Sequence, residues 1–258
     1  GEPAALAADW ARRTGLDLAV APWQSFRGPV TDLGGALAAV TAAAGHVAND
    51  VMLLARPELG ELGEPLAEGR GGSSAMPQKQ NPALSVLIRS AALQAPAQAM
   101  QLHLASALSE DERTGGAWHS EWPALRELLR LAAGAAAALR ELVVGLRVFP
   151  ERMRANLELS GPLLVSERIM LELADVAEGG RAGVQKAVDA ALAAAAQGAD
   201  PADQARVLRK ELRAVVRPDA AGEDFDARLD DLLDPAGYQG DAAGIVDRIL
   251  ATYEEKRK

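Results

Sequence analysis

Three long stretches of this chain carry apolar residues at the spacing of packed helices. The first, between Thr31 and Leu54, has them at alternating intervals of four and three residues: Leu33, Leu37, Val40, Ala44, Val47, Val51 and Leu54. This is the period of a helix that packs lengthwise in a bundle. The second runs from Leu84 to Leu108, and Pro96 predicts a kink in it. The third begins at Trp122-Pro123 and ends before Pro150. The spacing therefore predicts an all-α fold built on a bundle of long helices.

The sequence pattern changes after Pro150: the predicted helical segments become shorter, and glycines and prolines recur. We expect short amphipathic helices at about 163–177, 181–196, 202–214, 223–232 and 240–255. The organisation predicted is a central helical-bundle domain over 1–155 and a small helical C-terminal domain over 156–258. Aromatic residues make up only 3% of the chain, and alanine and leucine dominate, which favours helix almost throughout.

Composition narrows the classes of function. With no cysteine, disulfides and thiolate metal sites are excluded, and a reducing cytoplasm is the expected location. His46, His103 and His119 are too far apart in sequence for a metal-binding motif, so no metal is expected. A net charge of −9 argues against a nucleic-acid partner. No stretch approaches twenty charge-free apolar residues, so no membrane partner is expected either.

A polar segment lies between the first two long helical stretches. It reads Gly71-Gly72-Ser73-Ser74-Ala75-Met76-Pro77-Gln78-Lys79-Gln80-Asn81-Pro82. The glycines permit positive φ and the prolines exclude helix, so hydroxyls, an ammonium and an amide are placed together on a loop. Such groups can transfer a proton or hold an anion, and loops are where such groups concentrate. An ordinary polar turn is the alternative interpretation of a Gly-Ser-Ser sequence by itself.

The whole segment resembles the signature loop of the fumarase/aspartase superfamily, Gly-Ser-Ser-x-Met-Pro-x-Lys-x-Asn-Pro, at every fixed position. The resemblance implies that Ser73 acts as general base or acid at the carbon next to a substrate carboxylate. It also implies that Ser74, Lys79 and Asn81 hold the carboxylate or settle the loop. The intermediate would be stabilised by preorganised donors, without cofactor or metal. A catalytically silent loop is the competing hypothesis.

Three further segments resemble one branch of the superfamily, the 3-carboxy-cis,cis-muconate cycloisomerases. They are Glu112 to Trp122, Arg152 to Leu157 with Leu164 to Glu167, and Asp234 to Gly240 with Val246 to Arg248. This branch implies lactonisation of a small polycarboxylate in protocatechuate breakdown, with Arg113, Trp118 and His119 as substrate contacts. Two interpretations of Trp118 and Trp122 stay open, pocket walls and core packing. His46 is interpreted as an ordinary bundle histidine.

Departures from the cycloisomerase pattern put the substrate in question. Gln78 and Gln80 stand where that group commonly has His and Arg, and Phe26 and Gly28 replace an amide and an acid. Arg27 remains as a candidate carboxylate ligand. The alternative branch is adenylosuccinate lyase, which has a nearly identical loop, but the glycines and tryptophans of 115–122 cannot bind a phosphate through charge.

The resemblance also implies a homotetramer whose active sites are shared between subunits. Family members carry an N-terminal region before the point where this sequence begins, and that region supplies a histidine to the site. An alternative of another class is therefore a non-catalytic helical bundle that assembles but turns nothing over. Its exposed leucine faces would then be subunit interface.

Overall fold

The structure is a computed structural model that describes residues 2–73, 75–76, 79–217 and 224–257, apart from the side chain of Arg257. It confirms the all-α fold class, with only one pair of two-residue strands among these residues. The chain divides into two compact units, Gly1–Phe149 and Pro150–Lys258.

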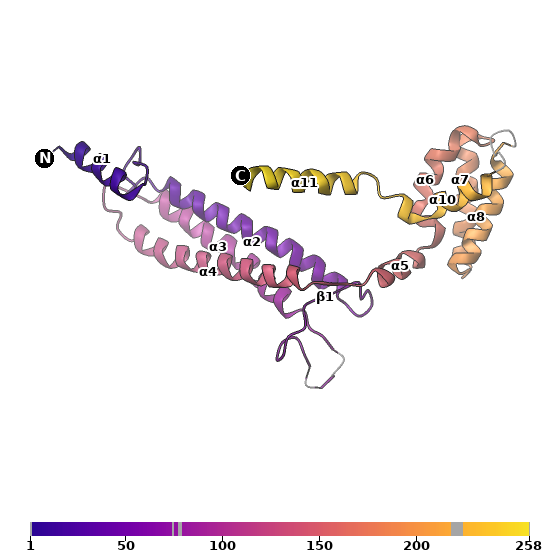
Figure 1. Cartoon of the computed structure of the whole chain (residues 1–258), viewed down its shortest axis with the longest axis horizontal. Coiled ribbons are helices and arrows are strands. Elements are labelled where there is room, and N and C mark those ends of the chain that lie inside the picture. Colours follow the sequence, from indigo (N-terminus) through magenta and orange to yellow (C-terminus); the bar gives the residue numbers. More distant parts are fainter. Residues whose placement is uncertain (1, 74, 77–78, 218–223, 258) are drawn as a thin grey trace. The chain divides into compact units, whose positions relative to one another are not determined.

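The first unit is a bundle of three long helices (Figure 1). A short helix α1 (Pro3–Thr14) and a loop lead into α2 (Gly28–Leu54), and α3 (Ala83–Ala107) and α4 (Ala117–Val144) complete the bundle. Strand β1 (Leu62–Gly63) pairs antiparallel with β2 (Arg147–Val148), with Leu62 opposite Val148. The fully buried side chains that hold the bundle together include Ala48, Ile88, Leu102, Leu128 and Leu142.

Small residues allow the helices of the bundle to lie close together. A Cβ atom added to Gly34 would stand 2.5 Å from Leu102 Cδ1, and one added to Gly45 would stand 2.5 Å from Ala92 Cβ. Both separations are shorter than real carbon contacts, so an added side chain would displace the end of Leu102 at Gly34 and would press against Ala92 of α3 at Gly45. The core of α2 is accordingly made mostly of small side chains: Thr31, Gly34, Thr41, Ala44, Gly45, Ala48 and Val51.

The predicted core stripe of α2 is therefore wrong in part. Ala44 and Val51 are buried, but Leu33, Val40 and Val47 are 44%, 51% and 40% exposed. Apolar spacing favours the large side chains of this helix, whereas its close contact with α3 buries the small ones. The large side chains occupy a neighbouring face of the helix, which the described residues of the first unit leave exposed.

The predicted start of the third long helix is also wrong. Helix α4 begins at Ala117, after Gly116 with φ of +77°, so Pro123 lies inside the helix. Proline at the seventh helical position removes the N–H that would reach the His119 carbonyl. The loop before the helix ends at Gly116, whose positive φ suits glycine, and therefore earlier in the sequence than the start predicted from Pro123.

Helix α2 bears on the prediction that no stretch of this chain is apolar enough to cross a membrane. By length and composition alone, α2 is apolar enough to cross a membrane, with a window of mean hydropathy 1.4. Leucines and valines supply most of that hydropathy, and the small residues of the same helix pack against α3 and α4. Its geometry is that of a bundle helix.

The second unit is a cluster of short helices. Helix α5 (Pro150–Leu159) is followed by η1 (Gly161–Val165), α6 (Ser166–Leu173), η2 (Ala174–Val176), α7 (Gly180–Ala196) and α8 (Pro201–Val215). Then come α10 (Phe225–Leu233), η3 (Pro235–Gly237) and α11 (Ala242–Arg257). Its core contains Ile169, Leu173, Leu208, Leu212 and Leu229. These spans agree with the predicted short helices to within about two residues, apart from the one predicted over 163–177. There α6 covers only Ser166–Leu173, and 3-10 helix lies on both sides of it.

Candidate active site

The signature loop extends from the end of the bundle where α2 finishes and α3 begins (Figure 1). Ser73 is partly buried, and its Oγ accepts a hydrogen bond of 3.2 Å from the Met76 backbone N–H. Lys79 is exposed, and its side chain makes no hydrogen bond or ion pair with the described residues. Ser74 lies outside the described residues. The loop thus carries a hydroxyl with a local donor and an exposed ammonium in the same short segment.

Asn81 closes the neck of this loop. Its backbone N–H donates to Gly71 O at 2.7 Å, and its side-chain Nδ2 donates to the same oxygen at 3.1 Å. Gly71 has φ of +74°, and a Cβ there would stand 2.7 Å from Asn81 O, so glycine is required. Asn81 thus connects the two strands of chain at the base of the loop.

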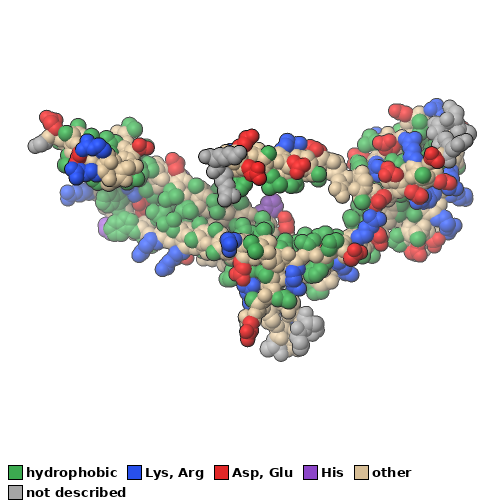
Figure 2. Space-filling view, viewed as in Figure 1, with side chains coloured by type: hydrophobic (Ala, Val, Ile, Leu, Met, Phe, Trp, Pro, Cys, Tyr) green, Lys and Arg blue, Asp and Glu red, His purple; other side chains and the backbone are tan. Residues whose placement is uncertain are grey.

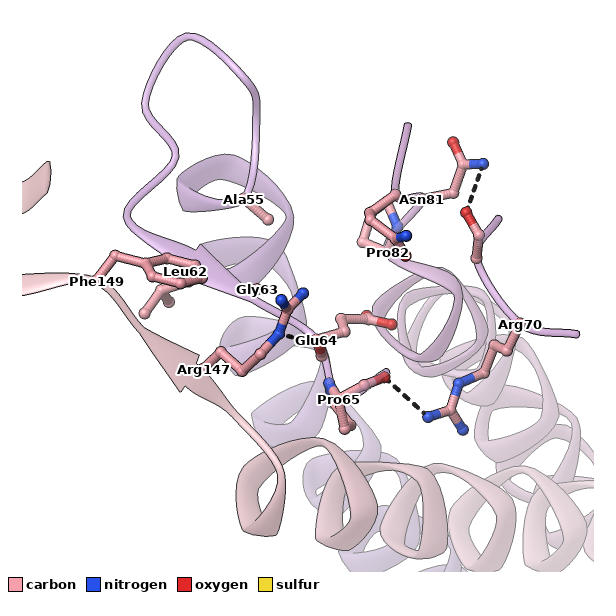
Figure 3. Close-up of a pocket in the computed structure, with 12 residues that line it drawn as sticks. Ala55, Leu62, Gly63, Glu64, Pro65, Arg70, Asn81, Pro82, Arg147 and Phe149 are labelled. Carbon is pink, nitrogen blue, oxygen red and sulfur yellow. Dashed lines mark hydrogen bonds between the residues drawn. The ribbon is translucent and has the colours of Figure 1, made fainter. Parts of the chain in front are cut away.

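Below the neck lies a small pocket of about 90 Å³, lined by residues that include Glu64, Arg70, Asn81 and Arg147 (Figure 3). Arg147 Nε donates to Glu64 O at 2.9 Å, and Arg70 donates to Pro65 O at 3.1 Å. Arg70 also pairs with Glu141 on α4. In this chain the space has room for a few water molecules and is too small for a polycarboxylate. Its lining residues connect the base of the loop to strands β1 and β2.

At the other end of the bundle, a second pocket forms between the loop before α2 and the segment before α4. Phe26 and Trp118 provide aromatic walls, and Glu112 and Arg113 provide charge. The Trp118 indole N–H donates to Gln24 O at 2.9 Å, which fixes the indole ring against this loop. Arg113 is exposed and makes no hydrogen bond or ion pair with the described residues. It thus places an exposed positive charge in the lining of this pocket.

Arg27 is engaged by a partner that the sequence analysis did not identify. Its Nε donates to Glu121 Oε2 at 2.9 Å, its Nη2 pairs with Glu121 Oε1, and its Nη1 donates to Trp23 O. The two side chains are only 14% and 4% exposed. Three of the five N–H donors of this guanidinium are therefore occupied within the chain. Glu121 lies one turn into α4, on the face that is buried in the bundle. A carboxylate at a buried helix position needs a cation as partner, and this is the sequence signal that could have revealed the pair.

His119 and Trp122 follow Trp118 in the first turns of α4. Their rings are 4.8 Å apart between centroids and tilted by 51°. Trp122 is 51% exposed, so it is not a core residue of this chain. Trp118, in contrast, lines the pocket. Of the two interpretations, pocket wall therefore fits Trp118, whereas neither describes Trp122.

The structure does not bring all candidate residues together within one chain. Ser73, Lys79 and Asn81 lie before α3, while Arg113, Trp118 and His119 lie after it, and Arg27 lies at that same far end (Figure 1). Helix α3 has 25 residues, so its ends are about 36 Å apart at a rise of 1.5 Å per residue. The described residues contain no group of three potential ligands that could hold a metal ion.

Comparisons with known proteins agree with the fold. The family described as lyase matches residues 5–97, and the family described as adenylosuccinate lyase C-terminus matches residues 162–249. Nitrosuccinate lyase from Streptomyces davaonensis is 47% identical over 241 residues, which are 93% of this chain and 48% of the relative. The 3-carboxy-cis,cis-muconate cycloisomerase from Pseudomonas aeruginosa is 38% identical, over 96% of this chain and 52% of the relative.

Among solved structures, the 3-carboxy-cis,cis-muconate lactonizing enzyme from Pseudomonas putida matches with a TM-score of 0.84 and 31% identity. The match covers 98% of this chain and 54% of that structure. The chain belongs to the fumarase/aspartase superfamily. It spans about half the length of the relatives that it matches.

Proposed function

We propose that this chain is part of a lyase that removes a proton from the carbon next to a carboxylate of a small polycarboxylic acid and expels a group from the neighbouring carbon. Ser73 accepts the proton, and Lys79 stabilises the charge that develops on the carboxylate. Closure of the loop over the substrate would exclude water and strengthen these interactions.

The substrate we propose is nitrosuccinate, and the 47% identity to a nitrosuccinate lyase is the observation that carries this choice. The C–H bond next to one carboxylate breaks, a carbon–carbon double bond forms, and the C–N bond breaks to release nitrite. The products are fumarate, nitrite and a proton, so atoms and charge balance without an oxidant. Charge supports the same choice. Gln78 and Gln80 stand where the cycloisomerases commonly have His and Arg, so this loop has two fewer cations for a tricarboxylate substrate.

The second candidate is 3-carboxy-cis,cis-muconate cycloisomerase, favoured by the 38% identity and by the TM-score of 0.84. In this reaction a substrate carboxylate oxygen adds to the conjugated double bond, and Ser73 donates a proton to the adjacent carbon. The enzyme would then act in protocatechuate breakdown. In either case we place it in the cytoplasm, in agreement with the absence of cysteine.

The test is turnover by the full-length gene product. Conversion of nitrosuccinate is measured as nitrite released, and conversion of 3-carboxymuconate as loss of its ultraviolet absorbance. Adenylosuccinate is the third acid assayed. We expect Ser73→Ala to lower kcat by about two to four orders of magnitude with a smaller change in KM. Ser74→Ala is the matched control. Equal and mild effects of both substitutions would refute the role of Ser73, and turnover of adenylosuccinate alone would refute the branch. No turnover of any acid would favour the non-catalytic bundle.

We also propose that the protein is a homotetramer in which the two ends of the bundle meet between copies. Each long helix carries exposed apolar residues at intervals of seven or fourteen, which is the spacing of a helix–helix seam. They are Leu33, Val40 and Val47 on α2, Val86, Leu93 and Met100 on α3, and Trp122, Leu129 and Val143 on α4. Figure 2 shows hydrophobic side chains over much of the visible face of the bundle.

Mixing of two inactive variants tests the shared site. In Ser73→Ala the far end of the bundle is intact, and in Arg113→Ala the loop is intact. Random assembly of equal amounts would give about one site in four with both parts intact, so about a quarter of wild-type activity should return. A mixture of Ser73→Ala with Lys79→Ala should stay inactive, because both changes lie in one loop. A wild-type monomer in analytical ultracentrifugation would overturn the proposal.

A further inference from the structure

Helix α3 begins directly after the signature loop without a cap of its own. The residue at its N-cap position is Pro82, which makes no side-chain hydrogen bond to the helix. The first turn also contains no acidic residue. The first N–H groups of a helix have no partner within the helix, so they need an acceptor from elsewhere.

That acceptor is the carboxylate of Glu64. Its Oε1 accepts from the Ser85 backbone N–H at 2.7 Å, and its Oε2 accepts from the Leu84 N–H at 3.0 Å. A negative charge at this position is also favoured by the helix dipole. Glu64 itself is held by its backbone, because its carbonyl oxygen accepts from Arg147 Nε at 2.9 Å (Figure 3).

This arrangement ties the two ends of the loop to each other. Glu64 lies directly after strand β1 and before the loop, whereas Leu84 and Ser85 lie just beyond it. The neck formed by Gly71 and Asn81 is a second closure, and Ser73 is two residues past Gly71. If the carboxylate were removed, the end of the loop would lose its anchor to β1 while the rest of the bundle kept its contacts.

We propose that Glu64 is a positioning residue that sets the loop, and with it Ser73, for the proton transfer. This inference rests on the proposed function for its catalytic consequence. A charge-assisted pair of hydrogen bonds at the base of a loop holds the geometry that reactive groups need, and small displacements of such groups cost about 10- to 100-fold in rate.

The experiment compares Glu64→Gln with wild type in the full-length gene product. The matched control is Glu68→Gln, which removes the same charge from an exposed side chain of the same segment. Hydrogen exchange followed by mass spectrometry should show exchange about 10- to 100-fold faster at the start of α3 and faster exchange over 65–82. Exchange in α2 and in the C-terminal half of α4 should not change. Well below the melting temperature, kcat should fall about 10- to 100-fold, with KM within about threefold.

The outcomes separate the two proposals. Unchanged exchange at the loop in Glu64→Gln, or equal effects in Glu68→Gln, would overturn the positioning role. A uniform increase in exchange across the bundle, or loosened exchange with kcat unchanged, would leave Glu64 as a purely structural residue and also overturn it. If wild type converts none of the acids, the proposed function fails, while local loosening still shows that Glu64 sets the loop. Should Glu64→Gln not fold, Glu64→Asp keeps the charge on a shorter side chain and carries the same expectation.

Discussion

The buried pair between Arg27 and Glu121 leads to a prediction about stability. We consider Arg27→Met, Glu121→Met and the double variant. Each single change leaves a charge buried without its partner, since the two side chains are 14% and 4% exposed. Such a loss costs about 3–5 kcal/mol, whereas replacing both charges by apolar side chains of similar size is often nearly neutral. The double variant should therefore be more stable than either single variant, with a coupling energy of at least about 2 kcal/mol.

Urea unfolding followed by tryptophan fluorescence measures this coupling in the right part of the molecule. Trp10, Trp23, Trp118 and Trp122 are the only tryptophans of the chain, and all four lie in the Gly1–Phe149 unit. Protein concentration is kept constant, because assembly of copies would add to the apparent stability.

The control is the pair of Arg70 with Glu141 in the same unit, which is more exposed at 23% and 53% and should couple by less than about 1 kcal/mol. Single variants of Arg27 and Glu121 that cost less than about 1 kcal/mol and add without coupling would refute the reasoning. Arg27 would then be free to hold a substrate carboxylate, as the sequence suggested.

Three further predictions concern single sites. Ser85 Oγ is fully buried and has no hydrogen-bond partner among the described residues, so Ser85→Ala should leave the unfolding free energy unchanged or raise it by up to about 1 kcal/mol; a larger loss in urea titration would contradict this. Gly45→Ala should lower it by about 1–3 kcal/mol, because the new Cβ would stand 2.5 Å from Ala92 Cβ, whereas Gly35→Ala, with open space around it, should not. A hydrogen bond from the Ala236 N–H and pairing with Arg154 hold the pKa of Asp234 below its usual value of 3.8. Its stabilising contribution is thus present above pH 3.8 and lost as the pH falls through the lower folded pKa. Circular-dichroism melts between pH 6 and pH 2.5 should show a smaller acid loss in Asp234→Asn; parallel curves would argue against it.

Helices were predictable from this sequence because their signals are local. The second long helix, expected over 84–108, is α3 at Ala83–Ala107. Each of its residues is specified by neighbours three or four positions away. The start of α4 was not predictable in the same way. Pro123 is typical of a first helical turn, but the helix begins at Ala117, directly after the positive φ of Gly116.

Partners at the site were not predictable because they are distant in sequence. Glu121 is 94 residues from Arg27, and Glu64 is about 20 residues from the helix that it caps. The loop motif named Ser73, Lys79 and Asn81, but no local pattern states which carboxylate satisfies which cation. A helix without a capping residue of its own, such as α3, does indicate that a hydrogen-bond acceptor for its first N–H groups must come from elsewhere in the chain.

The division of small and large side chains on α2 carries an argument about assembly. A helix in a monomeric protein places its largest apolar side chains inward, because each removes the most apolar surface from water. Here Gly34, Thr41 and Ala48 face the neighbouring helices, and Leu33, Val40 and Val47 face outward. Selection for close packing within the chain explains the first set but not the second, since polar residues would serve as well on a solvated face. The homotetramer that we propose would explain the second set, because another copy would cover these apolar residues on α2, α3 and α4.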